Sequence, residues 1–146
     1  MTDHMTILSV LKKKFEDLKD SGGETLLKSV MILMQPVTAK SVFDFCPDMT
    51  GFPALILFPR ETLPDNSGLT GSIMLELLLI AETYHPGRER DKLLSLQRII
   101  LDALTPDAAG KVPEAGGAHL LFLSARSETF GDTFSGWRIS LKACYA

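Results

Sequence analysis

The sequence predicts an α+β fold, in which a mixed, largely antiparallel β-sheet with a long hairpin carries two main helices packed on one face. Two segments have apolar residues at helical spacing, one near the start and one in the second half. The segments typical of strands are grouped in hairpins, joined by turns rich in Pro, Gly, Asp and Asn. The length of 146 residues suits a single domain spanning residues 1–146.

The first helix is predicted over residues 6–19. Its apolar residues recur at three- and four-residue spacing, so they share one face: Ile7, Leu8, Leu11, Phe15 and Leu18. Ser21-Gly22-Gly23 follows, and glycine supplies the left-handed conformation in which many helices end. The sequence therefore predicts that the helix stops before this turn.

The second helix is predicted over residues 88–104, and it has the strongest helical period in the chain. Its apolar stripe consists of Leu93, Leu96, Ile100 and Leu104, and is widened by Leu94, Ile99, Leu101 and Ala103. Thr105-Pro106 ends it, since the residue before a proline is disfavoured in a helix.

A long hairpin is predicted from residues 54–62 and 71–84, with turn residues between them. Pro59 cannot donate to a sheet ladder, so the first strand is expected to be an edge or bulged at that point. In 71–84, alternate residues define a core face and a second face, and the second face is mostly apolar with two glutamates. A helix lying over the sheet is the alternative interpretation of 71–84.

The remaining segments are shorter or more ambiguous. Residues 30–34 favour a strand, although a helix also fits this apolar run, and a short strand at 41–45 is expected to follow. Residues 107–118 are rich in Ala, Gly and Pro and predict a loop. Two strands, 119–126 and 135–145, close the chain as a hairpin around the loop 127–134.

Composition excludes several classes of protein. There are 15 basic and 18 acidic residues, a net charge of −3, which argues against a dedicated or sequence-specific nucleic-acid binder. No apolar stretch is long enough to span a membrane, and the start Met1-Thr2-Asp3-His4 lacks the pattern of a signal peptide. Two cysteines cannot form a disulfide-dense scaffold. The default expectation is a cytoplasmic protein.

No catalytic or cofactor-binding motif is present. None of His4, His85 and His119 has a second His or Cys at metal-ligand spacing, so no metal site is expected. Cys46 and Cys144 lie in no local motif that supplies a base, and no phosphate-binding glycine motif occurs. The sequence predicts no cofactor and no enzymatic activity.

The order of elements resembles the tail terminator and tail completion proteins of tailed bacteriophages, the family of the minor tail protein U. The resemblance covers Ile7 to Tyr145, and rests on the two helices and on three strand segments: Phe52-Pro53-Ala54-Leu55-Ile56-Leu57, Ser72 to Thr83, and Ser135-Gly136-Trp137-Arg138-Ile139-Ser140-Leu141. It implies a structural protein without an active site, with an α+β sheet covered by helices on one face.

The resemblance further implies a phage or prophage virion component, assembled in the bacterial cytoplasm as a ring, with six subunits expected. Its partners would be further copies of itself, the tail tube protein and the head–tail connector protein. The second face of 71–84 is then the candidate subunit contact, through Met74, Glu76, Leu78, Ile80 and Glu82, with Arg88 and Arg90 as ionic partners.

The alternative hypothesis is a small cytoplasmic α+β enzyme or ligand-binding module with a dispersed site. Its polar residues would come from distant parts of the chain, namely Cys46, Glu76, His119 and Arg138. This hypothesis requires that these side chains converge in a pocket.

Overall fold

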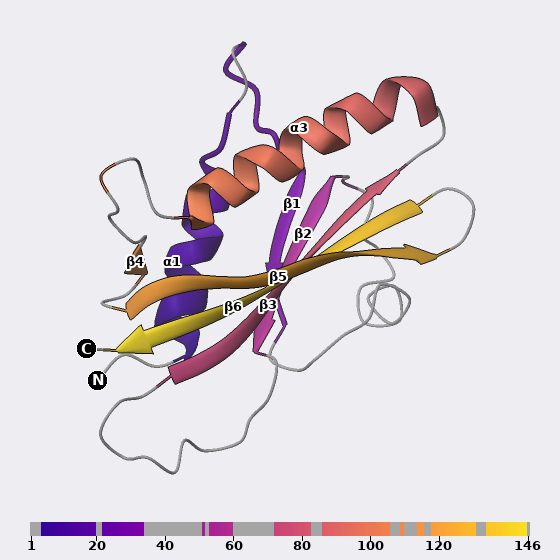
Figure 1. Cartoon of the computed structure of the whole chain (residues 1–146). Coiled ribbons are helices and arrows are strands. Elements are labelled where there is room, and N and C mark those ends of the chain that lie inside the picture. Colours follow the sequence, from indigo (N-terminus) through magenta and orange to yellow (C-terminus); the bar gives the residue numbers. More distant parts are fainter. Residues whose placement is uncertain are drawn as a thin grey trace.

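The fold was analysed in a computed structural model (Figure 1), which describes residues 4–19, 22–33, 51, 53–59, 72–82, 86–105, 109, 114–115, 118–130 and 134–145. The elements in chain order are α1 (His4–Glu16), β1 (Ser29–Ile32), β2 (Ala54–Pro59), β3 (Ser72–Glu82), α3 (Pro86–Leu104), β4 (Glu114–Ala115), β5 (Ala118–Phe130) and β6 (Phe134–Tyr145). The predicted α+β class is confirmed.

The six described strands form one mixed sheet in the order β1-β2-β3-β6-β5-β4. The pair β1–β2 is parallel, and every other neighbouring pair is antiparallel. The long hairpin is confirmed as β2–β3, so the alternative interpretation of 71–84 as a helix is wrong. Leu57 is the last residue of β2 that pairs with β1, and its carbonyl accepts from the Leu33 amide at 2.9 Å. Pro59 follows two residues later and has no amide hydrogen with which to continue this ladder.

The terminal hairpin, β5–β6, is longer than predicted. The strand expected to end at residue 126 continues to Phe130, through the polar stretch Ser127 to Thr129. Each of these residues pairs with β6, which itself begins at Phe134. Three consecutive polar residues show no alternation of apolar and polar side chains. The sequence pattern therefore underestimated the length of this strand.

Three further expectations concern short segments. The strand favoured at 30–34 is confirmed as β1, Ser29–Ile32. The expected loop at 107–118 contains the two-residue strand β4, which the sequence pattern did not predict. The strand expected at 41–45 lies outside the described residues.

Helix α1 ends at Glu16, before the predicted end at residue 19. The Asp17 amide still donates to the Lys13 carbonyl at 3.1 Å, but the Leu18 amide donates to Phe15, a tighter last turn. The chain then reverses, so that the Leu26 amide donates to the Leu18 carbonyl at 3.0 Å. Gly23, with φ of 83°, takes the left-handed conformation within this reversal.

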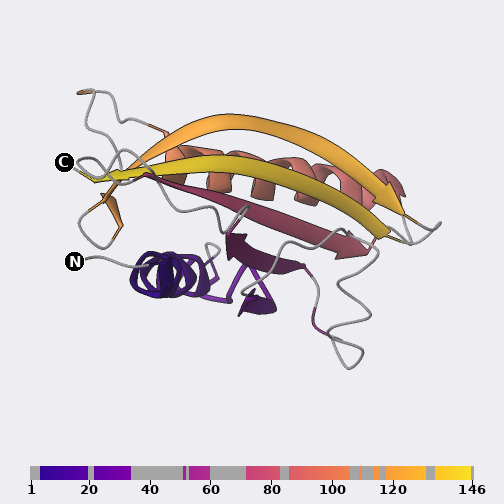
Figure 2. The same ribbon diagram turned by 90° about the horizontal axis from the view of Figure 1, so that it is seen from below.

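Both helices contribute to one hydrophobic core on the same face of the sheet. Helix α1 contacts β1 and β2, and α3 contacts β5 (Figures 1 and 2). The core joins apolar side chains of both helices to alternate residues of the strands: Ile7, Leu8, Leu11, Phe15, Leu55, Leu57, Leu75, Leu77, Leu79, Leu96, Ile100, Leu104, Trp137, Ile139, Leu141 and Ala143. The predicted packing of two helices on one face is confirmed.

The apolar stripe of α3 is narrower than its period suggested. Leu96, Ile100 and Leu104 are buried, and Leu101 and Ala103 pack against the core. Leu94 and Ile99 remain 52% and 36% exposed. Over residues 94–104, where its side chains are described, the helix therefore packs on the core along a narrow stripe, while Leu93 lies outside the described side chains.

Candidate functional site

The candidate site is the face of the sheet opposite the helices, called here the second face. It carries alternate residues of the three central strands: Ile56 and Phe58 of β2; Met74, Glu76, Leu78 and Ile80 of β3; and Arg138, Ser140, Lys142 and Cys144 of β6. The register places Ile56 beside Leu78 and Leu78 beside Arg138, so these residues share one face.

The apolar side chains of the second face are buried within the single chain. Ile56, Phe58, Leu78 and Ile80 are all 0% exposed, although none of them belongs to the core beneath the helices. Met74 is half-buried, as are Lys142 and Cys144 near the end of β6. On the neighbouring strand β5, the residues that the register puts on this face are exposed, namely Leu121, Ser124 and Arg126, so the second face is most accessible on its β5 side.

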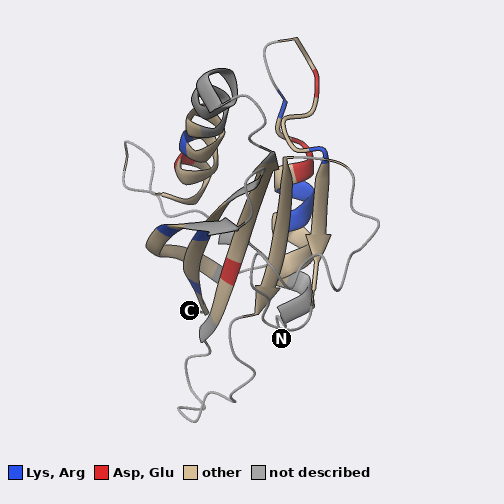
Figure 3. Cartoon of the chain, turned by 90° about the vertical axis from the view of Figure 1, so that its right-hand side faces the viewer, with Lys and Arg blue, Asp and Glu red and all other residues tan. Residues whose placement is uncertain are grey.

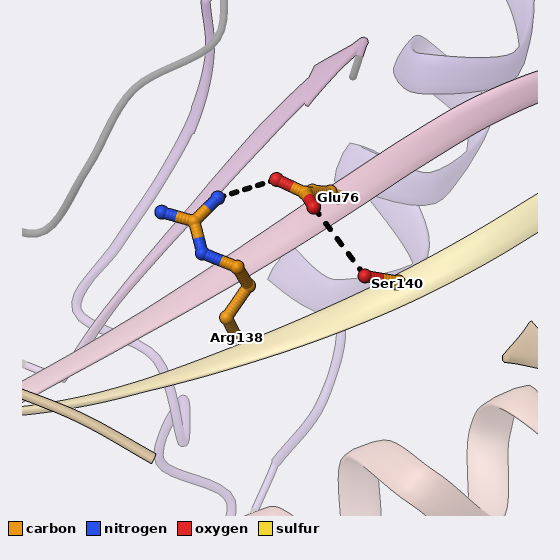
Figure 4. Close-up of polar contacts among 3 residues, drawn as sticks. All are labelled: Glu76, Arg138 and Ser140. Carbon is orange, nitrogen blue, oxygen red and sulfur yellow. Dashed lines mark hydrogen bonds and ion pairs between the residues drawn. The ribbon is translucent and has the colours of Figure 1, made fainter. Parts of the chain in front are cut away.

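A buried ion pair crosses the second face (Figure 4). The Arg138 guanidinium donates to the Glu76 carboxylate, and the two residues are 6% and 7% exposed. The Ser140 hydroxyl donates to the other oxygen of Glu76 at 3.3 Å. The guanidinium carbon of Arg138 also lies 5.5 Å from the centre of the Phe58 ring, within the range of a cation–π contact.

Glu76 and Arg138 neutralise each other's charge in a buried position, where an unpaired charge would lower the stability of the fold. Glu76 is directly opposite Ser140, while Arg138 is directly opposite Leu78, so the ion pair runs diagonally between β3 and β6. A slip of one residue between these strands would send one partner to the opposite face. The pair therefore favours the observed register of β3 and β6 over a one-residue slip.

Four of the predicted contact residues, Met74, Glu76, Leu78 and Ile80, share the second face, as their alternation indicated. Glu82 ends β3, and Arg88 and Arg90 lie near the start of α3, but the side chains of these three are outside the described part of the chain. The assignment of all seven residues to a subunit contact stays a prediction. The structure adds that Leu78 and Ile80 are already fully buried inside the single chain.

The ionic partner found for Glu76 is Arg138, within the same chain. The expected ionic partners for this face, Arg88 and Arg90, have side chains outside the described part of the chain, and the pairing of Arg138 with Glu76 is not among the sequence-based expectations. The alternation of β6 did place Arg138 opposite the core residues. The missing information was that β6 lies next to β3, which the order of segments along the chain does not reveal.

The residues of the enzyme hypothesis are brought together only in part. Glu76 and Arg138 form the ion pair, and Cys46 lies outside the described residues. His119 is paired with Cys144, four residues along β6 from Ser140, which is about 13 Å at the rise of a strand. His119 and the ion pair therefore occupy different parts of the second face.

The described residues contain no cluster of three or more His, Cys, Asp or Glu side chains arranged to hold a metal ion. Among them, no helix has both the length and the apolar character needed to cross a membrane.

Charged residues in the described part of the chain lie mostly on the helices and on the segment after α1, while the strands carry few (Figure 3). Among the described charges on the strands, only Glu76 and Arg138 are buried. Compared with protein-family models and with curated protein sequences, the chain matches none.

Proposed function

We propose that this chain is a structural component of a phage or prophage virion, a tail terminator or tail completion protein. In this role, copies of the chain assemble into a ring that caps the tail tube and joins it to the head. The observation that supports the proposal is the architecture: a first helix, a long hairpin, a second helix and a terminal hairpin, with both helices on one face. This is the α+β arrangement that the sequence resemblance implies.

A ring subunit needs surfaces that accept further copies of itself and surfaces that accept its partners. An open sheet with helices on one face suits this role, because an open sheet ends in edge strands that can pair with another chain. The proposed partners are the tail tube protein on one side of the ring and the head–tail connector protein on the other. No cofactor takes part.

The test is the solution mass of the purified chain, measured by light scattering over a concentration series, with negative-stain images of the same samples. Closed rings of about six subunits would support the proposal, since such cyclic closure is less common than two-fold symmetry among soluble oligomers. A chain that stays monomeric at all concentrations, and that also fails to form rings on tail tubes of the same phage or prophage, contradicts it.

A further inference from the structure

In the described part of the chain, the sheet ends in two different strand edges at opposite ends of the strand order. On one side, β5 pairs with β4 only at Ala118 and His119, and its outer edge pairs with no described strand from residue 120 onward. On the other side, β1 pairs with β2 and with no other described strand. Figure 1 shows these two strands on opposite sides of the hairpin β2–β3.

Along the outer strand β5, three consecutive large apolar side chains are exposed; the register puts Leu121 on the second face, beside Lys142, and Phe122 on the helix face, beside Leu141. Leu121, Phe122 and Leu123 are 42%, 37% and 45% exposed. The pairing with β6 is irregular between Phe122 and Ser124, so Leu123 has no direct partner on that side. A long edge strand with exposed apolar residues is a template for pairing with another strand.

The edge of β1 is also apolar over three consecutive residues, Val30, Met31 and Ile32, all half-buried. Val30 and Ile32 pack against the core, whereas Met31 is not among the residues packed there. The strand carries no charged residue. Arg126, the one charged residue of β5 whose exposed side chain the structure describes, would meet no like charge on β1.

We propose that the β5 edge of one copy of this chain pairs with the β1 edge of the next copy. A row of backbone donors and acceptors is best satisfied by another strand. Every copy carries both edges, and the two apolar runs would cover each other. Because the edges differ and lie at opposite ends of the sheet, the contact is head-to-tail, the kind of interface from which closed rings are built.

The inference rests on the proposed function for the closure of the ring, but the pairing of edges can be tested by itself. It moves the expected subunit contact from the buried central strands of the second face to the outer strands of the sheet. The experiment uses two edge variants. One carries Leu121→Lys and Leu123→Lys in β5, and the other carries Met31→Lys in β1. Lysine on an edge strand opposes pairing with another chain.

The matched control is Leu94→Lys on α3, since Leu94 is 52% exposed and lies on no strand edge. Light scattering should show that the control self-associates like the wild type, while each edge variant alone stays monomeric. An equimolar mixture of the two edge variants should form a heterodimer of twice the monomer mass, because one intact β1 edge and one intact β5 edge remain.

A mixture that stays monomeric, although circular dichroism shows both variants folded, overturns the inference. So does a β1 variant that self-associates as the wild type does. If a variant fails to fold, hydrogen exchange of the wild type decides: among residues 29–32 and 120–127, the amides that point away from β2 and β6 should gain at least tenfold protection on assembly, and unchanged protection overturns the pairing.

The outcomes also separate this inference from the proposed function. Head-to-tail oligomers that depend on both edges but do not close into rings would support the edge pairing and contradict the proposed ring. Rings that form equally well in both edge variants would support the proposed function and contradict the edge pairing.

Discussion

Lys14 of α1 donates a hydrogen bond from Nζ to the backbone carbonyl of Ala103, at 3.1 Å. This carbonyl lies in the last turn of α3, where carbonyl groups have no partner within the helix. Helix α3 has no basic side chain of its own in that turn. Helix α1 therefore supplies both a hydrogen bond and a positive charge at the negative end of the α3 dipole.

Replacing Lys14 should loosen this link between the helices. We expect Lys14→Met to lower the free energy of unfolding by about 0.5–1 kcal/mol, measured by urea denaturation. The control is Lys13→Met, because Lys13 is exposed and lies in the same last turn of α1. It removes the same charge from the α1 terminus without touching α3. Equal losses in the two variants would show that the contact with Ala103 contributes nothing.

The ion pair between Glu76 and Arg138 should behave as a buried pair in a mutant cycle. Arg138→Met leaves the Glu76 carboxylate buried without its cation, and should cost about 3–5 kcal/mol. The double variant Glu76→Leu/Arg138→Met removes both charges, and should regain most of that stability. Chemical denaturation of both singles and the double measures this coupling. A loss below about 0.5 kcal/mol in Arg138→Met, the size of a surface substitution, would mean that the pair is solvated.

Gly51 lies where a side chain would collide with the start of β1. A Cβ at this position would be 2.7 Å from the Ser29 hydroxyl oxygen and 3.2 Å from Cβ of Lys28. Gly51→Ala should therefore cost about 1–3 kcal/mol of stability. Adding Ser29→Ala removes the closest atom and should restore part of the loss, as thermal unfolding would show.

Gly23 provides the contrasting case. No atom lies within 4 Å of a Cβ placed there, but its φ of 83° strains any residue with a side chain. Gly23→Ala should cost about 1 kcal/mol, and Gly23→Asn less, because asparagine tolerates this conformation. Here Ser29→Ala should give no rescue, and a rescue would point to a contact that the structure does not contain.

The narrow contact of α3 predicts unequal effects of two neighbouring leucines. Leu96 is 5% exposed and Leu94 is 52% exposed. Leu96→Ala should cost about 2–4 kcal/mol, and Leu94→Ala no more than about 0.5 kcal/mol. The denaturant midpoints of the two variants, compared at an unchanged m-value, measure these losses of stability. Equal losses in Leu96→Ala and Leu94→Ala would indicate that α3 is rotated about its axis.

The second face can be tested for assembly without damage to the fold. Leu78 is fully buried, so Leu78→Asp should unfold the monomer, as seen by circular dichroism. Met74 is half-buried, so Met74→Asp should leave the monomer folded. We expect Met74→Asp to self-associate like the wild type, because the strand edges carry the contact. Loss of self-association in Met74→Asp would instead indicate that the second face forms the contact between subunits.

The sequence by itself determined the local elements and their faces, because side-chain periodicity is a local property. The three- and four-residue spacing from Ile7 to Phe15 defined α1 and its buried face. The alternation from Trp137 to Ala143 separated core residues from Arg138 and Ser140 on the other face. The hairpin order followed from short turns and indicated an α+β fold.

Only the tertiary structure decided which elements are neighbours, since strand pairing joins residues far apart in the chain. The apolar run Leu77 to Ile80 fits a helix or a strand, and its pairing with both β2 and β6 makes it a strand. The same placement of β6 beside β3 brings Arg138 to Glu76, and the packing of both helices on one face brings Lys14 to Ala103. These contacts depend on register and packing, which no local pattern of residues encodes.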